Sequence, residues 1–206
     1  MSDLVNWVLL TEVFVTLFVI MDPVGTIPLF LSLTRGRSAA TARHAAWQAV
    51  AVSFAVIVAF AFFGQQILAY LGISLAALQC AGGLLLLLVA LELLTGKEDD
   101  MATSSSGGNV ALVPLGTPLL AGPGAIVATM VFTRQVEGVA DFAALAAGIV
   151  LVHVCLWLAM RFSLPILRLL RESGVLLVTR IAGLLLSAIA VQLVADAVRA
   201  FIAGKG

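Results

Sequence analysis

The chain has 206 residues, of which 62% are hydrophobic and only 11% are charged, with eleven basic residues balancing eleven acidic ones. A soluble domain of ordinary composition has about 45–50% apolar and about 25% charged residues, so this chain has too few charges to cover a surface in water. The zero net charge and the lack of a basic run argue against a nucleic-acid partner. We therefore expect an all-α integral membrane protein whose main surroundings are the lipid bilayer.

Six apolar segments approach the roughly 20 residues that a membrane-spanning helix requires. Prolines and glycines break the first segment near residue 22 and the fourth near residue 118. We expect six transmembrane helices, with helices 1 and 4 broken. In chain order the segments are 4–33, 45–71, 73–94, 110–132, 139–160 and 175–203.

A polar stretch rich in acidic residues, serine and glycine separates the third segment from the fourth at 97–109. Such a composition is typical of a linker. It divides a single membrane domain into a first three-helix half at 1–96 and a second at 110–206. Because three is an odd number, the second half must cross the membrane in the opposite direction to the first.

An internal repeat supports this 3+3 inverted arrangement. The run Gly83-Leu-Leu-Leu recurs at Gly183, one hundred positions later. In the same register, Ala90 corresponds to Ala190 and Leu93 corresponds to Leu193.

The basic residues divide unequally between the two sides of the membrane. The positive-inside rule assigns the richer side to the cytoplasm, which places both termini in the periplasm and the chain in a bacterial inner membrane. The richer side holds Arg35, Arg37, Arg43, Lys97, Arg161, Arg168, Arg171 and Arg180, and the other side holds Arg134, Arg199 and Lys205.

The two breaks share a pattern, because each has two prolines five positions apart. Broken backbone at membrane depth is tolerated only where protein or a water-filled cavity supplies hydrogen-bond partners. A matched pair of breaks in two halves points to a solute site, whereas ordinary kinks packed with small residues are the structural alternative. The predicted substrate- and ion-binding residues are Asp22, Pro23, Gly25, Thr26 and Pro28 in the first break, and Thr117, Pro118, Gly122, Pro123 and Gly124 in the second.

Each break has a predicted chemical task. Half-helices that begin after Pro28 and Pro123 would present positive N-terminal ends to a substrate carboxylate. Glycine at position 25 would permit an unusual backbone shape. Carbonyl groups near Gly25 and Thr26 would then hold Na⁺ or a proton donor.

Asp22 is the most informative single residue. It precedes Arg35 by thirteen positions, which on a helical rise places it about 20 Å from the cytoplasmic edge. A carboxylate at that depth costs about 2.5–3.5 kcal/mol and is a functional residue by default. The sequence leaves a second role open, since Asp before proline also caps a helix.

Glu12 and His153 are weaker candidates, for a proton relay. Glu12 is equally consistent with a residue near the membrane interface, and His153 with a hydrogen-bonded packing residue. The sequence contains no GxSxG, HExxH or P-loop motif and no clustered metal ligands. We therefore expect neither an enzyme nor a bound cofactor.

The chain resembles the MarC family of bacterial inner-membrane proteins. The resemblance rests on Asp22-Pro-Val-Gly-Thr-Ile-Pro-Leu-Phe-Leu-Ser-Leu-Thr34 and on Pro118-Leu-Leu-Ala-Gly-Pro-Gly-Ala-Ile126. It implies six helices, outward-facing termini, distant kinship with amino acid exporters of the LysE type, and some relatives that carry glycine and alanine. By resemblance the functional positions are Asp22, Pro23, Gly25, Pro28, Pro118, Gly122, Pro123 and Gly124.

These observations lead to one functional expectation with a rival. We expect a secondary transporter of small neutral amino acids or similar metabolites, coupled to H⁺ or Na⁺, and a homo-oligomer is compatible with it. The rival is a membrane accessory or assembly protein that transports nothing and whose kinks serve packing against a partner.

Overall fold

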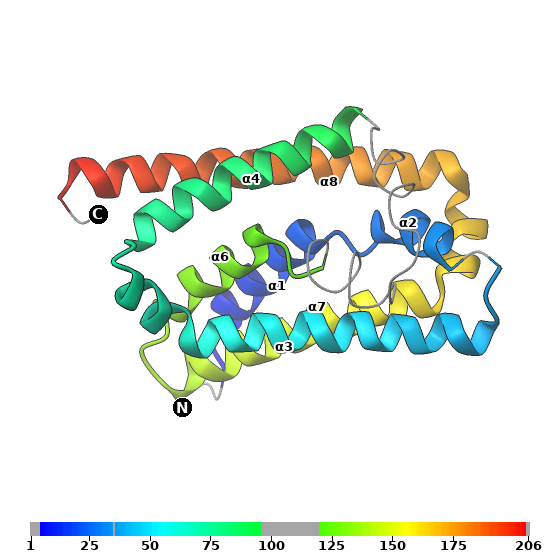
Figure 1. Ribbon diagram of the computed structural model, residues 1–206, viewed down its shortest axis with the longest axis horizontal. Coiled ribbons are helices and arrows are strands. Elements are labelled where there is room, and N and C mark those ends of the chain that lie inside the picture. Colours follow the sequence, from blue (N-terminus) through cyan, green and yellow to red (C-terminus); the bar gives the residue numbers. More distant parts are fainter. Residues whose placement is uncertain (1–4, 35, 96–119, 205–206) are drawn as a thin grey trace.

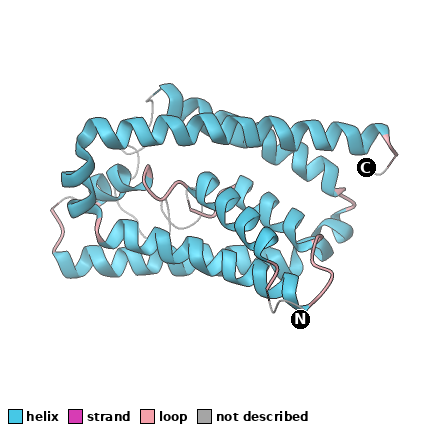
Figure 2. Ribbon diagram, turned by 180° about the vertical axis from the view of Figure 1, so that it is seen from behind, coloured by secondary structure: helices cyan, strands magenta, loops and turns pink. Residues whose placement is uncertain are grey.

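The computed structural model describes residues 5–34, 36–95 and 120–204, and the regular elements within these ranges are all helices (Figures 1 and 2). The predicted linker at 97–109 lies outside the described residues, so the division into two halves stays a prediction. The helices are α1 Trp7–Met21, α2 Thr26–Leu33, α3 Ala39–Leu71, α4 Leu75–Thr95, α6 Pro123–Thr133, α7 Val139–Arg161 and α8 Ser163–Ile202.

Four stretches are long and apolar enough to cross a membrane, namely α3, α4, α7 and the part of α8 from Ser173 to Ile202. The shorter apolar helices α1 and α6 belong to the two segments that were predicted to be broken. The expectation of an all-α, multi-pass membrane protein is therefore confirmed for the described part of the chain.

Two helices begin earlier than the apolar pattern predicts. α3 begins at Ala39 rather than at position 45, because the Ser38 hydroxyl accepts the N–H of Thr41 at 3.2 Å and caps the helix ahead of the apolar run. α8 begins at Ser163, and its helical backbone is interrupted at Arg171, where φ is 56°. The residues before this interruption precede the predicted span at 175–203.

Both termini lie at the same end of the molecule (Figure 1). The Asn6 side-chain amide donates to Asp141 Oδ1 at 2.9 Å, which ties the start of α1 to the start of α7. Arg134 at the end of α6 and Arg199 in the last turn of α8 belong to this end. The beginning of α3 and the end of α7 lie at the opposite end (Figure 1).

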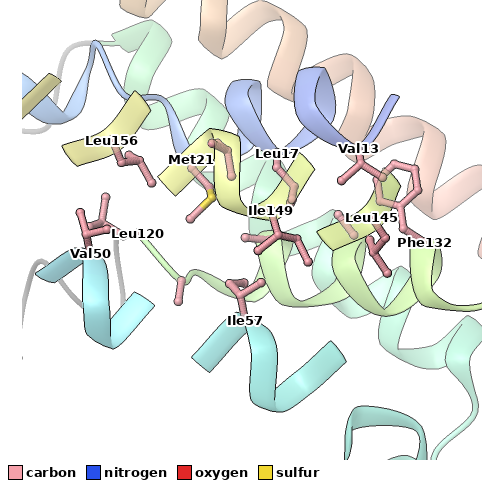
Figure 3. Close-up of a cluster of buried hydrophobic side chains, with 14 of the residues drawn as sticks. Val13, Leu17, Met21, Val50, Ile57, Leu120, Phe132, Leu145, Ile149 and Leu156 are labelled. Atoms are coloured by element: carbon pink, nitrogen blue, oxygen red, sulfur yellow. The ribbon is translucent and has the colours of Figure 1, made fainter. Parts of the chain in front are cut away.

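The larger of two buried clusters lies between α1, α3, α6 and α7 (Figure 3). Small residues bring these helices close together. A Cβ atom added at Gly148 of α7 would lie 2.6 Å from Val13 of α1, and one added at Gly64 of α3 would lie 2.7 Å from Met130 of α6. Close backbone approach of this kind is how helices associate in lipid, where water does not drive them together.

α4 and α8 form a second, antiparallel pair (Figures 1 and 2). A Cβ atom at Gly83 would lie 2.8 Å from the carbonyl oxygen of Ala190, and a Cβ atom at Gly183 would lie 3.3 Å from the carbonyl oxygen of Ala90. The contact is therefore reciprocal, and the four residues are the ones that recur at a spacing of one hundred. The buried hydrophobic cluster between the two helices consists of Leu86, Ala90, Leu93, Leu186 and Ala190.

We expect Gly83→Leu and Gly183→Leu each to lower the free energy of unfolding by about 1–3 kcal/mol, the usual range for overpacking. The cause is collision with the partner helix, whose backbone cannot move aside as a flexible side chain can. Thermal unfolding of the purified protein in detergent measures the effect. The control is Gly138→Ala, because a Cβ atom at Gly138 would meet nothing within 4 Å. Equal stability of the leucine variants and this control would contradict the close α4–α8 contact.

Candidate functional site

The first break separates α1 from α2 at Asp22. This residue has a φ of 36°, a left-handed conformation that residues other than glycine rarely adopt. The N–H of Asp22 donates to the carbonyl oxygen of Phe18 at 3.1 Å and closes α1. The carbonyl oxygen of Asp22 accepts both the N–H of Thr26 at 3.0 Å and the Thr26 hydroxyl at 2.8 Å. One strained residue thus ends one helix and supports the start of the next.

The Asp22 carboxylate is only half used by this turn. Oδ1 accepts the N–H of Gly25 at 3.0 Å and so caps the turn between the helices. The predicted helix start at Asp22-Pro23 is wrong, because Asp22 ends α1 and α2 begins only at Thr26. Oδ2 is buried and has no hydrogen-bond partner among the described residues. A buried polar atom that lacks a partner costs about 1–3 kcal/mol and requires a specific explanation. Capping alone therefore does not account for this side chain.

Position 25 requires glycine because there is no room for a larger side chain. A Cβ atom at this position would overlap Asp22 Oδ2 and would lie 3.2 Å from the Thr179 hydroxyl of α8. Its φ is not positive, so the predicted need for an unusual backbone shape is wrong. Close approach of three groups is the reason for glycine here.

Thr179 is a site residue that the sequence interpretation missed. It is only 5% exposed and comes from α8, a helix far from the first break in the sequence. The only signal for it was a hydroxyl group near the start of an apolar run, and many such residues merely hydrogen-bond to their own helix.

The described part of the second break begins at Leu120. Gly122 is the N-cap of α6, Pro123 is its first residue, and no side chain caps this end. A Cβ atom at Gly124 would overlap the Leu86 side chain of α4, so Gly124 serves close packing. The predicted site residues Thr117 and Pro118 lie outside the described residues.

The prediction that the half-helices begin after Pro28 and Pro123 is wrong. α2 begins at Thr26, two positions before Pro28, and α6 begins at Pro123 itself. The N–H groups of the first turn have no intrahelical partner. Proline, which lacks this N–H, is therefore accommodated inside the first turn.

Both breaks face the same protein interior. Met21 directly precedes Asp22, and Leu120 and Ala121 directly precede Gly122. All three belong to the larger buried cluster, and Figure 3 shows Met21 and Leu120 among its side chains. The described portions of the two motifs thus border one core rather than opposite lipid-facing surfaces.

The two predicted relay residues lie apart from this arrangement. Glu12 is exposed on α1, about 15 Å along the helix from Asp22. His153 is 4% exposed, its Nδ1 donates to the carbonyl oxygen of Ile149 at 2.7 Å, and its Nε2 lies 3.2 Å from the Ser53 hydroxyl. A carbonyl oxygen can only accept, so Nδ1 carries the proton and Nε2 accepts from Ser53. These contacts are those of a packing residue that joins α3 to α7.

The described residues contain no group of three His, Cys, Asp or Glu side chains that could hold a metal ion. An apolar cavity of about 250 Å³ lies between α3 and α7, and none of the predicted site residues lines it. The Asp22 carboxylate and Thr179 therefore lie outside this cavity.

Residues 7–202 match a family model described as MarC family integral membrane protein. The chain is 34% identical to a UPF0056 membrane protein of Methanocaldococcus jannaschii, over 90% of this chain and 94% of the relative. It is also 32% identical to the UPF0056 membrane proteins YvbG of Bacillus subtilis and YhcE of Escherichia coli. These two matches include 90% and 93% of this chain, respectively, and 92% of each relative. No solved structure matches the chain.

We expect Gly25→Ala to lower the free energy of unfolding by about 1–3 kcal/mol, because the new Cβ atom displaces the Asp22 carboxylate. A double-mutant cycle with Asp22→Ser measures the cause. The smaller serine leaves room for the Cβ atom, so the double variant should lose less stability than the sum of the two single variants. Strict additivity would show that the two residues do not compete for the same space.

Proposed function

The chain belongs to the MarC family of integral membrane proteins, and we propose that it is a secondary transporter of small neutral amino acids or similar small metabolites. The observation that carries the proposal is the buried, unpartnered Oδ2 of Asp22 at a helix break. A carboxylate inside the membrane is energetically costly, and such residues usually line a transport pathway or bind a ligand. Binding of a solute would supply the hydrogen-bond partner that Oδ2 lacks in the packed protein.

The geometry of the helices supports an inverted repeat of three spans per half. Gly83 contacts Ala190 while Gly183 contacts Ala90, which is the reciprocity expected across a two-fold axis. Ser53 and His153, also one hundred positions apart, contact each other between α3 and α7. Repeats of this kind permit alternating access by movement of one half against the other around a central site.

The two breaks offer complementary chemistry to a zwitterion. Asp22 provides a carboxylate oxygen for an ammonium group. The N-terminus of α6 has no side-chain cap at Gly122, so its first N–H groups can bind a carboxylate. A small side chain on the solute suits a site bordered by buried aliphatic residues. We propose that the solute is transported without being chemically changed.

The experiment is uptake of labelled alanine and glycine by purified protein in liposomes under an imposed proton or sodium gradient. We expect Asp22→Asn to reduce the initial rate about 10–100-fold, since a hydrogen bond to a charged group contributes about 1.5–3 kcal/mol. Gly122→Leu should also reduce the rate, because its side chain would obstruct the start of α6.

The matched control is Asp196→Asn, which changes an exposed carboxylate paired with Arg199 near the end of α8 and should leave the rate unchanged. Equal flux through all variants would remove Asp22 and Gly122 from the site. Absence of amino acid flux together with co-purification of a partner would favour a membrane accessory protein instead.

We further propose that the chain lies in a bacterial plasma membrane with both termini outside. The support is the excess of basic residues at the end opposite to the termini. A fusion of alkaline phosphatase to the C-terminus should be active, and a fusion to the polar stretch at 97–109 should be inactive. The reverse pattern would invert the topology without affecting the site.

A further inference from the structure

Asp22 and Thr179 approach the same small space from two different helices. The point where Gly25 would carry a Cβ atom overlaps Asp22 Oδ2 and lies 3.2 Å from Thr179 Oγ1. Thr179 is buried, and Oδ2 is the one buried side-chain nitrogen or oxygen atom in the described residues without a hydrogen-bond partner. Both atoms therefore border the space that a side chain at position 25 would fill, and they do not hydrogen-bond to each other in this structure.

We propose that this pair is a proton site, in which Asp22 takes up a proton at Oδ2 and the new O–H group turns toward Thr179 Oγ1 as its acceptor, a bond that is not formed in the structure described here. Thr179 is then the positioning residue for the coupling proton, and the transporter is driven by H⁺ rather than by Na⁺. The coupling role rests on the proposed transport function. The proton site itself does not.

The set of ligands favours a proton over an alkali ion. Oδ1 is already occupied by the Gly25 N–H, so the pair offers one carboxylate oxygen and one hydroxyl. An alkali ion requires several more oxygen ligands, whereas a proton requires one donor and one acceptor. The neutral acid also avoids the cost of a buried charge that has no partner.

No opposite charge stabilises an ionised Asp22 in the described residues. The one ion pair found there joins Arg199 to Asp196, far along α8. α2 carries no charged residue, and Arg180 beside Thr179 is exposed. The other titratable groups on the helices packed around the break are Glu12 on α1, Asp141, His153, Cys155 and Arg161 on α7, and Arg168 and Arg171 on α8, none of which hydrogen-bonds to Asp22.

Release of the proton follows from the contact between two elements. Thr179 belongs to α8, while Asp22 belongs to the break between α1 and α2. Separation of these elements removes the acceptor of the Oδ2–H bond and admits water. The O–H bond then breaks, the proton passes to water and Asp22 becomes a carboxylate, which can bind a solute ammonium group. Binding of proton and solute would therefore alternate at Asp22.

Infrared spectroscopy of the full-length protein in lipid tests the proposal. A protonated carboxylic acid has a carbonyl stretching band that shifts in D₂O. We expect this band in the wild-type protein at mildly acidic pH and its loss in Asp22→Asn. Thr179→Val should weaken the proton affinity by a factor of about 2–12, which corresponds to one hydrogen bond, and Thr179→Ser should restore it. The control is Thr129→Val, since Thr129 is also buried but donates to the carbonyl oxygen of Ala125 in its own helix at 2.7 Å.

Each other outcome would overturn the proposal. If the wild-type protein lacks the band, or if the band persists in Asp22→Asn, Asp22 is not a protonated acid. If the band is unchanged in Thr179→Val, Thr179 does not position the proton. Loss of the band when Na⁺ replaces choline at constant pH would assign the site to an alkali ion. Failure of the flux experiment alone would refute the transport function and leave the proton site intact, because the infrared measurement needs no solute.

Discussion

Every polar group inside a membrane must find a partner within the protein, and at Asp22 this requirement is met only in part. The backbone of the break is satisfied by Phe18, Thr26 and the carboxylate oxygen Oδ1. The second carboxylate oxygen is buried without a described partner. A turn needs only one of these oxygens. The remaining oxygen therefore sets the chemistry of the site, and the surrounding helices determine what can reach it.

Small residues give the surrounding helices their positions. The space left free at Gly25 is bordered by the Asp22 carboxylate and by Thr179 of α8, and Gly148 lets α7 pack directly on α1. The Gly83 and Gly183 contacts hold α4 and α8 together in a reciprocal way. Substituting any of these glycines would change helix spacing and not merely local conformation. The site and the fold thus depend on the same feature, which is close backbone approach in lipid.

Composition and periodicity were sufficient to predict the membrane class, the helical fold and the break at Asp22, because hydrocarbon imposes those constraints on every residue. The start of α2 was misplaced, since proline marks a first turn without marking its first residue. Thr179 could not be predicted, because its role depends on the proximity of α8 to a break more than 150 positions earlier. The role of Gly25 was misassigned for the same reason, because the sequence does not show that Asp22 and Thr179 lie where a side chain at position 25 would be.

The central claim is that the break at Asp22 forms a binding site for a small solute, and ligand-dependent thermal stability tests it most directly. A ligand that binds only the folded protein adds about 2.7 kcal/mol at 100 times its dissociation constant. A panel of small neutral amino acids should contain at least one that stabilises the wild-type protein to this extent and fails to stabilise Asp22→Asn. If every amino acid leaves the wild-type protein unchanged, or stabilises both forms equally, the Asp22 break is not the binding site.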